Sequence, residues 1–428
     1  MRSGLLQPGT ARGYAVAGDE AVLAALVAAE VAWLGVLSEN GCAPAGLAET
    51  FAGAVEAQPL DLASVAARGA EGGNPVIPLV DDLRARVGGG DAARFVHRGL
   101  TSQDVLDTAL ALVASDALED VAGSLRRAGD ALAAHAEEHR TTVTTGRTLT
   151  QHAVPITFGL KASQWLTSVE EALGEVETCR AELPVQCGGA AGTLAGVGVA
   201  AQTAVRGTGA PGDGTTHPDP LDLAGLWAER LGLSWPGAPW HTRRRPVTRI
   251  GDTLAAVVSA LGHVATDVAT LSRPEIAELG EGLAPGQGRS STMPHKRNPV
   301  LSVLVRAAGL QAGPLAGLLH QCAALAVDER SDGAWHAEWP TLQRLLVLAV
   351  TTADQAATLV EGLAVDADAM AARVAVVGDV SLSEWRGLSL DLAASPQVPE
   401  GAGAADYLGA STTLTDDAVR RWRERTHR

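Results

Sequence analysis

One stretch of the chain combines residue types that could move a proton on an anionic substrate. Residues 280–299, GEGLAPGQGRSSTMPHKRNP, place two adjacent hydroxyls close to a lysine and an amide: Ser290, Ser291, Lys296 and Asn298. The glycines of this stretch give backbone freedom and its prolines cannot continue a helix, so a mobile loop is predicted. Composition alone fits a solvated connector as well as a catalytic loop.

Two further polar segments interrupt or begin long apolar patterns. They are HRGLTSQD at 97–104 and GRTLTQH at 146–152. Each segment taken singly could be a helix cap, and Thr101 with Asp104 three positions later is predicted to form a capping box. A functional role for these segments therefore needs support from elsewhere in the chain.

Apolar residues at helical spacing predict the elements that position these segments. Helices are expected over 19–40, from Thr101 for nearly forty residues, over 156–183, from 221, and over 247–279, 300–325, 335–363 and 415–425. No period-2 alternation is sustained, so no strand is predicted, and residues 141–155 are expected to form a polar turn. The chain is predicted to be all-α.

The predicted helices suggest three helical domains. These are an N-terminal domain at 1–100, a central bundle of long helices at 101–352 that contains the loop, and a C-terminal domain at 353–428. Helices as long as the one after Thr101 are typical of bundles whose members run side by side, often between subunits. We therefore expect the central bundle to assemble with other subunits.

Composition limits the partners of the chain. The net charge of −16 argues against binding nucleic acid or an anionic membrane surface. The four cysteines are too scattered for a zinc pattern and too few for a disulfide framework. No run approaches 18 uninterrupted apolar residues and the N-terminus lacks a leader-like apolar core, so a soluble, cytoplasmic protein is expected.

The loop string SSTMPHKRNP resembles the signature loop of the fumarase/aspartase superfamily. The segments at 97–104 and 146–152 resemble, in the same order, the other two signature regions of that superfamily. The resemblance covers nearly the whole chain and implies an all-α homotetramer in which three subunits contribute to each active site. It also implies a small polycarboxylate substrate and neither a metal nor another cofactor.

The resemblance implies roles for individual residues. Ser290 would carry the proton, Lys296 and Asn298 would hold the carboxylate beside the acidic carbon, and Thr101 would bind a substrate carboxylate. His152 could be a replacement acid, a carboxylate ligand or a structural histidine. The implied catalytic residues are Ser290, His152 and Lys296, and the implied substrate-binding residues are His97, Arg98, Thr101, Ser102, Thr148, Gln151, Ser291, Met293, Asn298 and Arg330. His336 and Glu338 are expected to orient Arg330, which would bind an extra carboxylate bidentately.

One position departs from the superfamily pattern. Many members carry histidine after GRT, where it assists the leaving group, and this chain has Leu149. Leucine cannot donate a proton, so the leaving group is expected to depart as a stable anion, as a carboxylate with a pKa of about 4 does. Cleavage of a C–N bond of the adenylosuccinate or argininosuccinate type is therefore disfavoured.

The subgroup that the sequence resembles most is the bacterial 3-carboxy-cis,cis-muconate cycloisomerases of the β-ketoadipate pathway. The stretches HRGLTSQDVLDTAL, TLTQHAVPITFGLKASQWL, STMPHKRNPV and WHAEWPTL carry this resemblance. An alternative is a fumarate-releasing lyase of the nitrosuccinate or adenylosuccinate type, and nitrite too leaves as a stable anion. A non-catalytic structural relative is a third possibility, against which Ser290, Lys296 and Asn298 argue.

Overall fold

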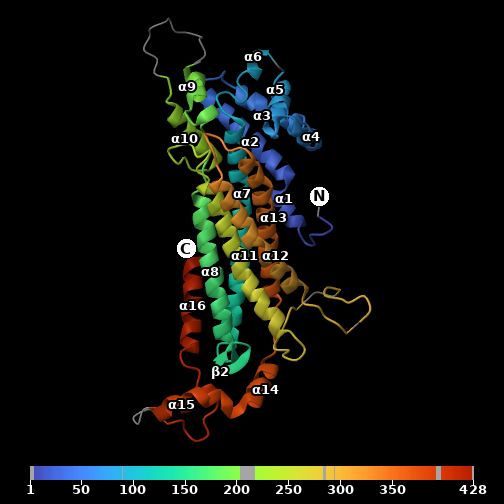
Figure 1. Cartoon of the computed structure of the whole chain (residues 1–428), viewed down its shortest axis with the longest axis vertical. Helices are drawn as coiled ribbons and strands as arrows, with labels where there is room; N and C mark the ends of the chain where they lie inside the picture. Colours follow the sequence, from blue (N-terminus) through green and yellow to red (C-terminus); the bar gives the residue numbers. More distant parts are fainter. Residues whose placement is uncertain are drawn as a thin grey trace. The chain divides into compact units, whose positions relative to one another are not determined.

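The computed structural model describes residues 4–88, 90–202, 217–282, 286–293, 295–391 and 397–426. The described chain is mostly helical (Figure 1). Its α-helices are α1 Ala11–Ala17, α2 Asp19–Glu39, α3 Leu47–Ala57, α4 Leu62–Gly72, α5 Val76–Arg86, α6 Gly90–Ala93, α7 Ser102–Glu138, α8 Phe158–Ala181, α9 Ala195–Gln202, α10 Pro220–Leu231, α11 Arg245–Leu271, α12 Val300–Ala324, α13 Gly333–Glu361, α14 Ala367–Val377, α15 Ser383–Asp391 and α16 Ser411–Thr426. Short 3-10 helices cover Gly189–Ala191, Gly378–Leu382 and Ala404–Asp406.

The chain divides into two compact units. Unit 1 comprises Met1–Asp120, Glu177–Leu254 and Pro314–Thr351, and unit 2 comprises Val121–Val176, Ala255–Gly313 and Thr352–Arg428. The five long helices α7, α8, α11, α12 and α13 contribute residues to both units. The division into domains at 1–100, 101–352 and 353–428 stays a prediction.

Helix α7 follows the predicted pattern closely. It has 37 residues, and the stripe that predicted it is buried along its whole length. This stripe consists of Leu106, Leu110, Val113, Val121, Leu125 and Leu132. Removing apolar side chains from water stabilises a fold by about 25 cal/mol per Å². The spacing of the stripe therefore determines which face of α7 packs against its neighbours.

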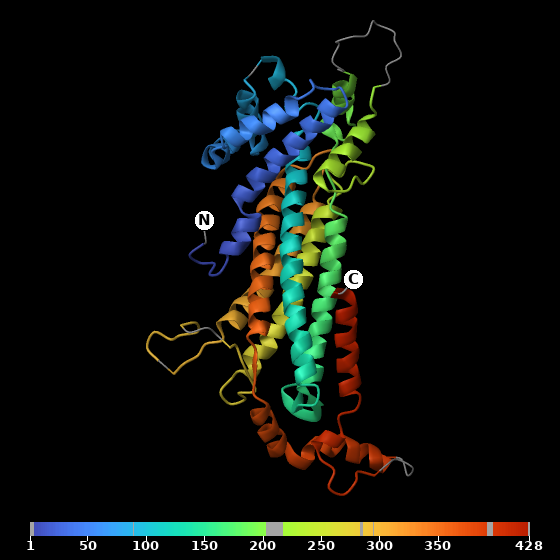
Figure 2. The same ribbon diagram turned by 180° about the vertical axis from the view of Figure 1, so that it is seen from behind.

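The prediction of a purely helical chain was wrong at residues 141–155. Strand β1, Val143–Thr148, pairs antiparallel with β2, Gln151–Thr157, and Figure 2 shows this hairpin beyond the ends of α7 and α8. Thr144 and Thr145 are both buried although neither is apolar, so the strand lacked the alternation of apolar and polar residues that would have predicted it. Leu149 and Thr150 form the turn with φ of 48° and 70°, as a type I′ turn requires.

Helix α11 ends earlier than the sequence suggested, and a second small sheet follows it. The helix stops at Leu271 instead of residue 279, because Pro274 cannot donate a helical hydrogen bond. Strand β3, Leu279–Gly280, then pairs antiparallel with β4, Ala364–Val365. This pairing fixes the backbone at the point where the signature loop begins.

Three helical segments are long and apolar enough to cross a membrane by length and composition: Ala11–Glu39, α11 and α12. In unit 1, α11 and α12 are joined by a polar contact of 2.8 Å between Asp252 and His320. The apolar window of α12 is only 28% buried, which leaves an apolar surface on this helix. The cytoplasmic location stays a prediction.

Candidate active site

Unit 1 brings together two predicted residues that are far apart in the sequence. Thr101 directly precedes the first residue of α7, and Arg330 lies in the segment between α12 and α13. The Arg330 guanidinium donates to Thr101 Oγ1 at 2.5 Å and to the Ala190 carbonyl at 3.0 Å. A cation and a hydroxyl therefore lie together at the N-terminus of a 37-residue helix, where the helix dipole also favours an anion.

Asp104 organises the backbone around this pair. Its fully buried carboxylate accepts hydrogen bonds from the N–H groups of Thr101 at 2.9 Å, Gly188 at 2.8 Å and Gly189 at 2.9 Å. It also contacts His241 Nε2 at 2.8 Å. The capping function of Asp104 was predicted, but its contacts with Gly188, Gly189 and His241 were not. They join segments that no local sequence pattern connects.

The Gly188 position admits no side chain. A Cβ atom there would lie 2.6 Å from His241 Cε1 and 2.9 Å from Pro239 Cβ, closer than real Cβ contacts. The glycine-rich run that follows Cys187 therefore lets the backbone approach the Asp104 carboxylate. Small residues in such a run are typical of a close backbone approach.

We expect Asp104→Asn to destabilise unit 1 and to weaken substrate binding. The amide replaces an acceptor with a donor that faces other donors, and hydrogen bonds to a charged group contribute about 1.5–3 kcal/mol. Urea unfolding should show a loss of this size, and KM should rise because Thr101 is no longer held. The control is Asp61→Asn, since Asp61 caps α4 and asparagine caps helices equally well. Equal stability and KM for Asp104→Asn and the wild type would contradict this role.

His97 is held in an uncommon backbone conformation by one buried carboxylate. Glu30 of α2, 1% exposed, accepts from the His97 N–H at 3.1 Å and contacts Nδ1 at 2.6 Å, and the φ of His97 is 62°. Trp33 donates to the Arg98 carbonyl at 2.8 Å. Burial alone would lower the pKa of His97, but the charge and hydrogen bond of Glu30 outweigh it and raise this pKa above 6.5.

The raised pKa of His97 makes part of the stability dependent on pH. Because the folded pKa lies above the unfolded value of about 6.5, the contribution is complete below that pH and disappears as pH rises through the folded pKa. Urea unfolding between pH 5.5 and 9 should therefore show that Glu30→Gln lowers the free energy of unfolding most at low pH. The control is Glu39→Gln, at the exposed end of the same helix. If Glu30→Gln lowered the free energy of unfolding equally at every pH, the stability would not depend on the protonation of His97.

The β1–β2 hairpin carries the second group of predicted residues. The side chains of Thr148, Gln151 and His152 are exposed, and Leu149 at the tip is 96% exposed. Close to this tip, Arg147 pairs with the buried Glu278, with Nη1 to Oε2 at 3.0 Å. This ion pair, which the sequence analysis did not predict, joins the hairpin to the residues just before the signature loop.

The signature loop carries the third group, and residues 283–285 and 294 of it lie outside the described residues. Ser290 Oγ accepts from the Met293 N–H at 3.2 Å, and the Lys296 N–H donates to the Met293 carbonyl at 3.0 Å. Asn298 donates to the Gly288 carbonyl through its backbone at 2.9 Å and its side chain at 3.2 Å. The side chains of Ser291, Met293 and Lys296 are exposed.

Glu281 anchors the beginning of the loop to the helix that follows it. Its buried carboxylate accepts from the N–H groups of Leu301 at 3.1 Å and Ser302 at 2.6 Å, in the first turn of α12. These amides have no partner within the helix, so the carboxylate acts as a cap supplied from outside it. Twenty positions separate Glu281 from Leu301, which is why no capping pattern could predict the contact.

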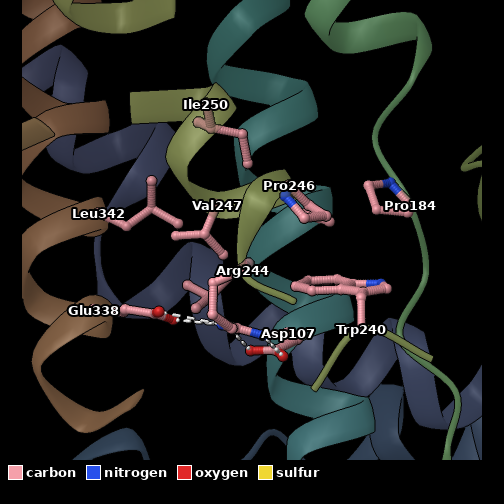
Figure 3. Close-up of a pocket in the computed structure, with 11 residues that line it drawn as sticks. Asp107, Pro184, Trp240, Arg244, Pro246, Val247, Ile250, Glu338 and Leu342 are labelled. Carbon is pink, nitrogen blue, oxygen red and sulfur yellow. Dashed lines mark hydrogen bonds and ion pairs between the residues drawn. The ribbon is translucent and has the colours of Figure 1, made fainter. Parts of the chain in front are cut away.

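Unit 1 also contains a buried ion cluster (Figure 3). Arg244 contacts Asp107 at 2.6 Å and Glu338 at 2.6 Å, and all three side chains are at most 3% exposed. Trp335 donates to Asp107 at 2.9 Å. Burial raises the pKa of Glu338, an effect that Arg244 partly offsets. The pocket drawn in Figure 3 also has Trp240 and apolar side chains in its lining.

The cluster corrects one expectation about Arg330. Glu338 was expected to orient that guanidinium, but its carboxylate binds Arg244 instead. His336 Nδ1 contacts the carbonyl of Asp332, one turn earlier. Arg330 is held by the side chain of Thr101 and the carbonyl of Ala190. Neither contact could be predicted from the helical spacing around Glu338.

Comparison with known proteins shows the family to which the chain belongs. A family model described as "Lyase" matches residues 85–209 and 203–312, more than half of the chain. The chain belongs to the fumarase/aspartase lyase superfamily. The matched residues include the first segment, the hairpin and the signature loop of this lyase.

Two curated relatives and one solved structure illustrate the similarity. The lyase is 41% identical to a nitrosuccinate lyase of Streptomyces davaonensis, over 97% of this chain and 94% of the relative. It is 37% identical to a 3-carboxy-cis,cis-muconate cycloisomerase of Pseudomonas aeruginosa, over 88% of this chain and 78% of the relative. The crystal structure of 3-carboxy-cis,cis-muconate lactonizing enzyme from Pseudomonas putida matches with a TM-score of 0.82 and 30% identity, covering 96% of each chain.

Proposed function

We propose that the lyase is a 3-carboxy-cis,cis-muconate cycloisomerase that closes a lactone by adding a substrate carboxylate across a diene. The observation that carries the proposal is Leu149, which occupies the exposed tip of the hairpin where many superfamily members have a histidine. Leucine offers no proton to a leaving group. The chemistry must therefore suit a group that departs as a stable anion, and the carboxylate of a lactone does so in the reverse direction.

The proposed mechanism uses Ser290, Lys296 and Asn298. A carboxylate oxygen of the substrate bonds to one carbon of a diene double bond, and the displaced electron pair moves to the other carbon of that bond and onto the carboxylate that this carbon carries, as an aci-carboxylate. Lys296 and Asn298 would stabilise that charge, because fixed cations and donors lower the barrier where charge develops. Ser290 would then deliver its hydroxyl proton to the neighbouring carbon and regain a proton from solvent. No redox step is involved.

The remaining substrate carboxylates need binding sites of their own. Arg330 and Thr101 already lie together, and the N-terminus of α7 adds free amide groups. Arg98 and His97 come from the segment just before them. A guanidinium matches a carboxylate bidentately, which supports Arg330 as the ligand for one of these groups. Ser102, Thr148, Gln151, His152, Ser291 and Met293 would complete the lining.

We also propose that the lyase is a homotetramer whose active sites take residues from three subunits. The predicted residues form three groups, on the first segment with Arg330, on the hairpin and on the signature loop. The apolar side chains of α12 support an assembly, because Val303, Leu310 and Leu318 are 52%, 81% and 38% exposed. Exposed apolar side chains of this size are often buried in protein interfaces.

A second candidate function is the elimination of nitrite from nitrosuccinate. The Streptomyces davaonensis relative favours it, because its 41% identity extends over 97% of this chain. Nitrite also leaves as a stable anion, so Leu149 is compatible with this reaction. The same three residues would then act in the opposite sense, with Ser290 removing a proton beside a carboxylate.

One assay separates the two candidates. Purified lyase is mixed with 3-carboxy-cis,cis-muconate and, separately, with nitrosuccinate and adenylosuccinate. The cycloisomerase is expected to remove the diene absorbance of the first substrate at a rate that is proportional to enzyme concentration. An unchanged diene absorbance together with release of fumarate from either succinate derivative would overturn the proposal, and the accompanying nitrite or amine would identify the reaction.

A further inference from the structure

The C-terminal end of α7 carries two imidazoles and a carboxylate that the proposed reaction does not use. His135, Glu138 and His139 have the spacing H-x-x-E-H. One ligand atom from each side chain lies within 4.8 Å of those of the other two. The His139 N–H donates to the His135 carbonyl at 3.0 Å, so the helical turn extends through His139. Residues three and four positions apart share one face of a helix, which explains the grouping.

The hydrogen bond of His135 leaves its other ring nitrogen able to bind a cation. His135 Nε2 lies 2.9 Å from the Val360 carbonyl. Because a carbonyl can only accept, Nε2 carries the proton, and Nδ1 of the neutral ring then has a free lone pair. Histidines that bind metals commonly donate their other N–H to a backbone carbonyl in this way. The arrangement around His135 thus matches that of a metal-bound histidine.

His139 is oriented by a second set of contacts. Its Nδ1 lies 3.2 Å from Thr142 Oγ1, which leaves Nε2 as the ligand atom of this ring. The ring also packs edge-on against Phe158, with centroids 5.4 Å apart. The two imidazoles are nearly parallel, at an interplanar angle of 18° and a centroid separation of 6.4 Å. Both rings are therefore held in place by protein groups before any cation binds.

The two neighbouring carboxylates differ in their surroundings. Glu137 pairs with Arg423 of α16 at 2.5 Å, which neutralises its charge. Glu138 belongs to the histidine face, and its side chain is exposed to solvent. The chain therefore offers a natural comparison between one carboxylate inside the cluster and one beside it.

We propose that His135, Glu138 and His139 bind a divalent transition-metal ion of the Zn²⁺ type, with water completing the coordination. Two imidazoles and one carboxylate suit Zn²⁺ better than Ca²⁺ or Mg²⁺, which prefer oxygen ligands. Bond lengths of about 2 Å require the side chains to rotate toward one another from their present separation. A cation is also favoured at the C-terminal end of a helix by the helix dipole.

The bound ion would stabilise the base of the hairpin. His135 and Glu138 lie in the last turn of α7, His139 directly follows it, and Thr142, which contacts His139, directly precedes β1. A ligand that binds only the folded state raises its stability in proportion to the logarithm of its concentration. The inference is independent of the proposed reaction, because none of the three side chains is assigned to substrate or to proton transfer.

Titration calorimetry of the tag-free, metal-stripped full chain with ZnCl₂ tests the proposal. We expect one saturable binding event per chain and a higher melting temperature with Zn²⁺ than without it. His135→Asn and His139→Asn should each abolish the event, and Glu138→Gln should weaken it at least several-fold. MgCl₂ should give neither heat of binding nor a thermal shift.

Two matched variants serve as controls. Glu137→Gln removes the adjacent carboxylate, and His263→Asn removes an exposed histidine with an acidic residue four positions later. Both should bind Zn²⁺ as the wild type does. Circular dichroism of each metal-free variant establishes that it folds. Absence of a saturable event in the wild type, or equal binding by folded His135→Asn and His139→Asn, would overturn the proposal.

Discussion

Replacing Ser290 with alanine is expected to lower kcat by about 10²–10⁴-fold, the contribution of a positioned proton carrier. Alanine removes the only atom of Ser290 that can carry the proton. It also removes the acceptor for the Met293 N–H, at 3.2 Å, which is a local contact within an exposed loop. The fold and the oligomer should therefore remain intact. Steady-state kinetics with the substrate identified by the assay above measure kcat. Size-exclusion chromatography measures whether the oligomer remains intact.

A surface serine supplies the control for this prediction. Ser259→Ala removes a hydroxyl that donates to the Ala255 carbonyl on α11, and it should leave kcat unchanged. If folded Ser290→Ala retains kcat within a factor of a few, Ser290 is not the proton carrier. The search for that carrier would then move to His152 and Lys296.

Arg244→Met is expected to lower the free energy of unfolding by about 3–5 kcal/mol, the cost of leaving buried charges without their partner. The guanidinium lies between Asp107 and Glu338 and forms an ion pair with each carboxylate. Removing it leaves two buried carboxylates next to each other. Chemical unfolding in urea, followed by circular dichroism, measures the loss.

The control for Arg244 is an arginine that also binds two carboxylates, but at the surface. Arg420 contacts Asp417 and Glu424, both at 3.1 Å and both exposed. Arg420→Met should cause little or no measurable loss, because solvent screens exposed ion pairs. A loss for Arg244→Met as small as that for Arg420→Met would mean that the cluster contributes little to stability.

The sequence predicts the parts of the fold that depend on local spacing. The apolar stripe of α7 and the Thr101–Asp104 cap are patterns within one element, and the helix begins at Ser102 as they require. The ends of α12 and α13 lie within two residues of the predicted ends for the same reason. In the candidate site, local patterns located the three polar segments but not their partners.

The parts of the fold and of the candidate site that the sequence did not predict depend on contacts between distant residues. The contacts of Asp104 with His241, of Arg147 with Glu278 and of Glu281 with α12 join positions that no period connects. The hairpin was not predicted because two buried residues of β1 are threonines, so its sequence does not alternate between apolar and polar residues. Such contacts become visible only after the long helices have brought their segments together.

The turn at Leu149 and Thr150 has a consequence for evolution and engineering. Left-handed backbone is costly for residues other than glycine, above all for a β-branched residue such as threonine, and exposure of a leucine adds nothing to stability. Asn-Gly, the sequence that such turns favour, would relieve this strain. Selection for stability alone would therefore change both residues. Their presence makes the hairpin tip a place where stabilising mutations and retention of activity are expected to conflict.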